Sequence, residues 1–145
     1  MPSMHSAMSP ASPPWRFRLI ALTVLSLVVV VAVLVRAAAA RTRDTTARAQ
    51  LLGELRRLDD QQAAWDARHG TFARQFGATE NDTTLAFTPT PGVELRFEAS
   101  VPGGWSAIAT SDRLLAAPRR CGIYRGPPAA APHRALSAPG AVVCW

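Results

Sequence analysis

The chain has 145 residues and a formal net charge of +6, and arginine supplies all of its cationic side chains because lysine is absent. Once the long apolar run at residues 19–35 is set aside, this length leaves room for only one small domain. The arginines are scattered and several flank an apolar run, which favours attraction to a membrane surface over nucleic-acid binding.

Residues 1–15 form the expected leader, which is rich in proline and serine and offers little that a core could bury. Its prolines are Pro10, Pro13 and Pro14. This composition predicts a disordered segment. Met4 and Met8 are alternative start positions.

Residues 16–40 are predicted to form a transmembrane helix. The central run from Leu19 to Val35 holds only Ala, Leu, Ile, Val, Thr and Ser. As a helix it would rise about 26 Å, close to the roughly 30 Å of hydrocarbon in a bilayer. A cleaved signal peptide is the alternative, with Ala37 and Ala39 before the cleavage site. The length of the run and the intrusion of Arg36 favour an uncleaved anchor.

Residues 41–69 are predicted to continue as an amphipathic helix. One set of side chains recurs every three or four residues, which places its members on a single face. They are Leu51, Leu55, Leu58, Gln62 and Trp65. Gly70 is well placed to end the helix. No proline lies between Pro14 and Pro89, so span and extension are expected to form one helix of about 50 residues.

Residues 70–145 are predicted to form a small β domain. Val93, Leu95 and Phe97 alternate with charged residues, which indicates a half-buried strand. A strand at 85–87 is expected to pair with it as a hairpin. Further strands are expected at 105–111, 121–124 and 141–145, and the segment Gly126–Pro139 is typical of a surface loop.

Short consecutive strands predict an antiparallel sheet packed on the amphipathic helix, which is an α+β fold. A core built from residues 70–145 alone would be thin, because short chains bury a small fraction of their surface. The helix face with Leu51, Leu55, Leu58 and Trp65 is therefore expected to complete the core.

The two cysteines, Cys121 and Cys144, lie in the last quarter of the chain. An even pair beyond a membrane span fits a disulfide formed in an oxidising compartment. A metal site that adds His133 is the alternative, but it lacks a fourth ligand and any C-x-x-C spacing.

The arginines around the apolar run and the cysteine pair suggest opposite membrane topologies. Two precede the run and four follow it, so the positive-inside rule favours a cytoplasmic C-terminus. These residues are Arg16 and Arg18 before the run, and Arg36, Arg41, Arg43 and Arg48 after it. The cysteine pair indicates an extracytoplasmic domain instead.

The order of a short basic leader, one apolar helix, an amphipathic extension, a small sheet and a cysteine loop resembles type IV pilins and type II secretion pseudopilins. The segment Phe17-Arg18-Leu19-Ile20-Ala21-Leu22 looks like the F-T-L-I-E-L start of a mature pilin. His69-Gly70-Thr71-Phe72 is similar to the turn that ends the pilin helix, and the stretches at Trp105, Cys121 and Cys144 look like the last strands of pilin-like domains.

The resemblance implies a pilin-like fold and a structural or accessory role in a pilus or pseudopilus. It also implies an inner-membrane protein with a single span and a periplasmic domain. The implied partners are membrane lipid and other pilin-like subunits, met through the N-terminal helix.

The prepilin motif at Arg16, Phe17, Leu19, Ile20 and Ala21 departs from the family pattern in two places. Arg16 stands where prepilin peptidase requires glycine, and Ala21 stands where the family has an acidic residue. We therefore expect no cleavage at the Arg16–Phe17 bond and a protein that remains bitopic.

Residues of the types that often act in catalysis are scattered in the sequence. His5, His69 and His133 lie far apart, and the adjacent pair Asp59-Asp60 points to different helix faces. Nucleotide-binding, nucleophile-elbow and zinc-protease motifs are absent. We expect no enzyme activity, no cofactor, no metal and no nucleic-acid partner, and we identify no small-molecule substrate. A membrane-tethered binding module that uses the 126–139 loop is the alternative function.

Overall fold

The computed structural model describes residues 14–145, and the side chains of Trp15 and of residues 19–145. Most of the expected leader and the side chains of Arg16 and Phe17 lie outside the described residues. Contacts divide the chain into a first unit that ends at Ala39 and a second unit, Ala40–Trp145. We refer to residues 40–145 as the domain.

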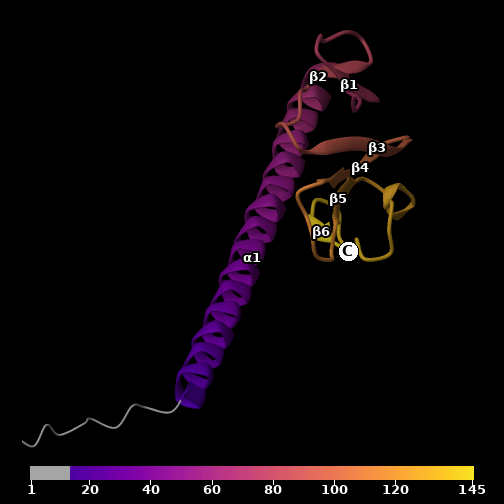
Figure 1. The fold of residues 1–145 in the computed structure, drawn as a ribbon. Helices are drawn as coiled ribbons and strands as arrows, with labels where there is room; N and C mark the ends of the chain where they lie inside the picture. The colour runs from indigo at the N-terminus through magenta and orange to yellow at the C-terminus, as the bar shows by residue number, and fades with distance from the viewer. Residues whose placement is uncertain (1–13) are drawn as a thin grey trace, which may run out of the picture. The chain divides into compact units, whose positions relative to one another are not determined.

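One α-helix, α1, runs over Pro14–His69 and therefore includes both the expected span and its expected extension (Figure 1). It ends at Gly70, whose φ of 68° is in the left-handed region. The Gly70 N–H donates to the Asp66 carbonyl at 2.7 Å, which satisfies one of the last carbonyls of the helix. The prediction of a single long helix is confirmed.

The strands of the domain form two sheets. The smaller sheet pairs β1 (Gln75–Gly77) with β2 (Thr84–Ala86) in parallel. The larger sheet is antiparallel and has the order β3-β4-β5-β6. Its strands are β3 (Glu94–Val101), β4 (Gly104–Thr110), β5 (Arg120–Arg125) and β6 (Val143–Cys144), with a short 3-10 helix, η1, at Pro128–Ala130. The α+β class and the antiparallel sheet are confirmed.

The expected hairpin between residues 85–87 and the strand at Val93 is wrong. β2 pairs with β1, and β3 pairs only with β4. The connection Thr88-Pro89-Thr90-Pro91-Gly92 explains the difference, because two prolines remove the N–H donors that a tight hairpin ladder needs. The turn closes instead through the Val93 N–H, which donates to the Thr90 carbonyl at 3.0 Å.

The main core lies between α1 and one face of the larger sheet. In the register of β3 and β4, Leu95 faces Ala109 and Phe97 faces Ala107. Leu95 is buried while Glu94 and Arg96 are exposed, as the alternation predicts. The cluster contains, among others, Leu51, Leu55, Leu58, Trp65, Leu85, Phe87, Trp105, Ile123 and Cys121.

The segment expected as a surface loop at 126–139 instead covers the other face of the larger sheet. Ala130 and Leu136 are buried and form a second cluster with Tyr124. The reason is the two-residue alternation of β5, which sends Ile123 into the main core and Tyr124 to the opposite face. The Tyr124 side chain on that face would otherwise be exposed to solvent, and the proline-rich segment buries it.

Candidate functional site

The first feature that bears on function is the apolar part of α1. Its side chains from Leu19 to Val35 are exposed, and its most apolar stretch has a mean hydropathy of 2.8 with none of it buried. Soluble domains rarely expose a contiguous apolar surface of this kind. By length and composition the helix can cross a membrane.

The prepilin-like residues that can be described lie on this helix. Leu19, Ile20 and Ala21 are exposed helical positions, and the Thr23 hydroxyl donates to the Ile20 carbonyl at 2.8 Å. The side chains of Arg16 and Phe17, the other members of the motif, lie outside the described residues. In the sequence the first acidic residue is Asp44, so no carboxylate accompanies the apolar run.

The second feature is the part of α1 that belongs to the domain. Leu51, Leu55 and Leu58 are fully buried, and Trp65 is almost so. They pack in the main core with the inward side chains of the larger sheet. Ala47 also belongs to this face, which sequence reasoning missed because a lone alanine gives little periodic signal.

Gln62 holds the chain that leaves the helix. Its side chain is 0% exposed. Its amide nitrogen donates to the Ala73 carbonyl and its amide oxygen accepts from the Ala73 N–H, both at 3.0 Å. The pair satisfies two buried backbone groups at once. The spacing predicted that Gln62 shares the buried face, but not that it acts as a clamp.

Replacing Gln62 by leucine is expected to lower the free energy of unfolding by about 1–3 kcal/mol, because the Ala73 N–H and carbonyl would remain buried without partners. Chemical unfolding followed by tryptophan fluorescence measures the change. Gln75→Leu is the matched control, since the Gln75 side chain is exposed. Equal stability of the two variants would show that the hydrogen bonds between Gln62 and Ala73 do not stabilise the domain.

Two acidic residues join α1 to the rest of the domain. Glu54, which is buried, pairs with Arg57 at 2.6 Å and accepts a short hydrogen bond from the Thr90 hydroxyl. Asp59 accepts two hydrogen bonds from Arg125 of β5, at 2.8 and 2.6 Å. The hydrogen bond to Asp59 raises the pKa of Arg125 above its usual value. The two parallel hydrogen bonds between Arg125 and Asp59 fix the helix against the sheet.

Cys121 and Cys144 form a disulfide between β5 and β6, where they face each other in register. The bond joins residues separated by 23 positions and encloses the segment that covers the second sheet face. Neither thiolate remains for the metal site considered above. Among residues 14–145 no group of three or more potential metal-binding side chains comes together.

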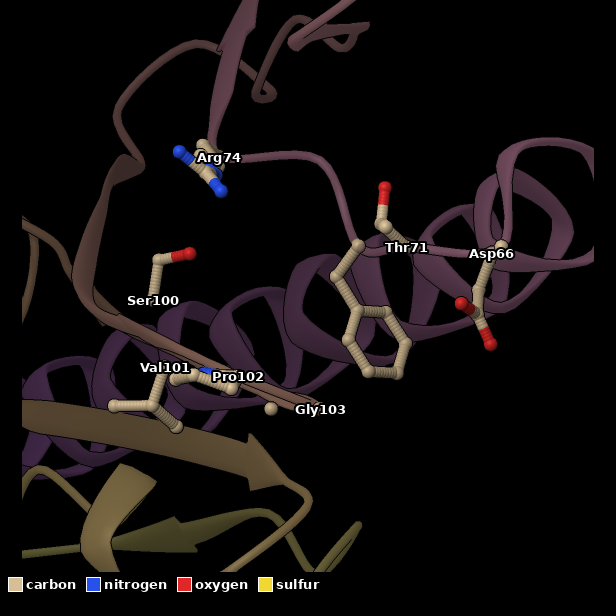
Figure 2. Close-up of a pocket in the computed structure, with 10 residues that line it drawn as sticks. Asp66, Thr71, Arg74, Ser100, Val101, Pro102 and Gly103 are labelled. Carbon is tan, nitrogen blue, oxygen red and sulfur yellow. The ribbon is translucent and has the colours of Figure 1, made fainter.

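A cleft of about 380 Å³ lies beside the turn after α1 and the β3–β4 turn. Asp66 and Arg74 are its charged lining residues, and Figure 2 shows them on opposite sides of the opening. Thr71 and Ser100 add hydroxyls, but no histidine or cysteine lines it.

The histidines of the domain pack on tryptophans. His69 stacks on Trp65 with ring centroids 4.1 Å apart, and His133 stacks on Trp145 at 4.5 Å. Neither lines the cleft. His5 lies outside the described residues.

Comparisons with known proteins add no family to these observations. No protein-family model matches the chain, and no curated protein or solved structure shows a significant match to it.

Proposed function

We propose that the protein is a pilin-like, membrane-anchored structural or accessory subunit of a type IV pilus or type II secretion pseudopilus. The observation that carries the proposal is that one helix supplies two things. Its first part exposes an apolar run of membrane-spanning length, and its later part provides the buried face of a disulfide-closed sheet domain. The protein would be non-catalytic, with its single span in the inner membrane.

The departures from the prepilin motif favour an accessory over a repeating subunit. Arg16 precedes the expected cleavage bond, and Ala21 supplies no carboxylate to pair with a new amino terminus. An uncleaved chain that entered a filament core would carry Arg16 and Arg18 into hydrocarbon. Each would cost at least about 2.5 kcal/mol. Capping or assisting an assembly avoids this cost.

Photo-crosslinking in the native envelope tests the proposed role. A photoreactive amino acid at Val28, which is exposed on α1, is expected to capture proteins that carry a pilin-like N-terminal helix. The same probe at Arg56, on the exposed face of the domain's helix, is the control and should capture fewer of them. Crosslinks from Val28 to lipid alone would contradict the proposal.

A membrane-tethered binding module is the second candidate, and the cleft beside Arg74 and Asp66 is the observation that favours it. Its occupant would be a small ligand with both polar and apolar parts, because hydroxyls, two opposite charges and Phe72 share the lining. Arg74→Ala would then weaken binding of that ligand to the cleft without changing the crosslinks from Val28.

The domain is expected to lie outside the cytoplasm. The disulfide supports this orientation, because such bonds persist in oxidising compartments. A C-terminal alkaline phosphatase fusion should therefore be active, and a C-terminal fluorescent-protein fusion exported by the same route should remain dark. The reverse pair of results would mean that the arginines after the span decide the topology.

A further inference from the structure

The segment 111–120 comprises the β4–β5 loop, residues 111–119, and Arg120, the first residue of β5. Its loop part is bound to the first residues of the domain's helix. The Leu115 and Ala116 N–H groups donate to the two carboxylate oxygens of Asp44, at 2.8 and 3.0 Å. Arg48 donates to the Pro118 carbonyl at 3.5 Å, and Arg119 donates to the Leu115 carbonyl at 2.7 Å. The three contacts with Asp44 and Arg48 hold the loop against helix residues 41–48, and the fourth lies within the loop.

The loop exposes an apolar side chain at this position. Leu115 is 57% exposed, whereas its neighbour Leu114 is buried in the main core. Within residues 40–145, Leu115 is the one large hydrophobic side chain that is exposed. A single exposed leucine is ordinary on a protein surface, so its meaning depends on what surrounds it.

Positive charge is in excess in the two segments that these contacts join. Segments 41–48 and 111–120 together contain six arginines and two aspartates, and the rest of the domain contains seven arginines and eight acidic residues. The six are Arg41, Arg43, Arg48, Arg113, Arg119 and Arg120. Within the domain none of these six is in an ion pair, whereas four of the other seven are. The two segments therefore carry the domain's whole excess of positive charge.

The same segments are close to the apolar run along the chain. Asp44 follows Val35 by nine residues. Nine residues span about 14 Å as a helix and at most about 30 Å in any conformation. The point where the loop is bound thus stays near any bilayer that the apolar run crosses.

We propose that the β4–β5 loop and residues 41–48 form a contact with the anionic bilayer surface. Arginines such as Arg113 and Arg119 would bind lipid phosphates, and Leu115 would enter the boundary between headgroups and acyl chains. Anionic lipid is the occupant that matches both the charge excess and the position in the chain. The inference rests on the proposed anchoring by α1, and it adds a second contact that orients the domain on the membrane.

Hydrogen–deuterium exchange of the full chain in nanodiscs tests this contact. The protein is reconstituted in phosphatidylcholine alone and in phosphatidylcholine mixed with phosphatidylglycerol. Peptides that cover residues 111–118 are expected to exchange about fivefold or more slowly with the anionic lipid, the change that one arginine near a charged surface supplies. A peptide that covers 94–100 of β3 should exchange equally in both.

Variants distinguish the loop from net charge. Arg113→Gln with Arg119→Gln is expected to remove the difference between the two lipid mixtures, and Leu115→Ser to reduce it. Arg56→Gln with Arg74→Gln changes the net charge equally, at exposed arginines outside the two segments, and should retain the difference. The readout is a ratio between lipids, so loosening of the loop itself cancels.

Three outcomes would overturn the inference. The first is equal exchange in both lipid mixtures, and the second is equal loss of the difference in the Arg56 and Arg74 variant. The third is protection that follows the number of protein copies per disc and not the lipid, which would make the loop an interface between copies. A chain that fails to enter nanodiscs would instead refute the proposed anchoring, and the lipid contact with it.

Discussion

Replacing Leu55 or Leu58 by alanine is expected to lower the free energy of unfolding of the domain by about 2–5 kcal/mol. Both side chains are fully buried in the main core. Truncation removes their transfer free energy and leaves a cavity that the close-packed surroundings fill only partly. Urea unfolding of the detergent-solubilised full chain, followed through the buried Trp65 and Trp105, measures the loss.

Arg56→Ala is the control for this experiment, because Arg56 lies between the two leucines and is exposed. Its cost should be well under 1 kcal/mol. If the leucine variants were as stable as the Arg56 variant, this part of α1 would be a stalk and not a core element.

A fragment that begins at Gly70 extends the same test. It lacks the buried helix face, the Gln62 clamp and the Asp59–Arg125 pair. What remains is too small a core for a chain of this length, so the fragment should be unfolded even when its cysteines are oxidised. A soluble, cooperatively folded fragment would show that the sheet and its disulfide suffice.

Loss of the Cys121–Cys144 bond is expected to destabilise the domain by about 2–5 kcal/mol. The enclosed loop alone corresponds to about 3 kcal/mol in the chain-entropy model. The bond also secures β6, which has only two residues, and the backbone pair between Arg120 and Trp145. The Trp145 ring lies against Gly122, where a Cβ would come within 2.6 Å of it, so loss of β6 also removes this packing.

The double variant Cys121→Ala with Cys144→Ala measures this loss without leaving a free thiol. Chemical reduction of the unaltered protein should shift the unfolding midpoint in the same direction. Protein taken from its native envelope should resist alkylation until it is reduced. Two free thiols in that protein would contradict both the bond and the oxidising compartment.

Local patterns predicted much of this fold. The recurrence of Leu51, Leu55 and Leu58 identified the buried face of α1, and the alternation around Leu95 identified β3. Gly70 marked the end of the helix. These predictions succeed because the helix and strand periods follow from regular backbone geometry, which places residues a few positions apart on the same face.

Contacts between distant residues could not be predicted in this way. Asp59 looked like half of a carboxylate pair, but its partner is Arg125, 66 positions away. Asp44 is hydrogen-bonded to Leu115, 71 positions away. The parallel β1–β2 pair and the buried role of the 126–139 segment likewise depend on which surfaces meet after folding, and no local period encodes that.

The intact mass of the protein purified from its native membrane, combined with amino-terminal sequencing, tests the central claim most directly. That claim is that one uncleaved helix both anchors the chain and completes the core of its domain. The predicted result is a membrane-bound protein whose amino terminus precedes Arg16. A mature chain that starts at Phe17 would show that the degenerate motif is still cleaved. A chain released from the membrane and starting just after Ala39 would show a signal peptide, and either result would contradict the account.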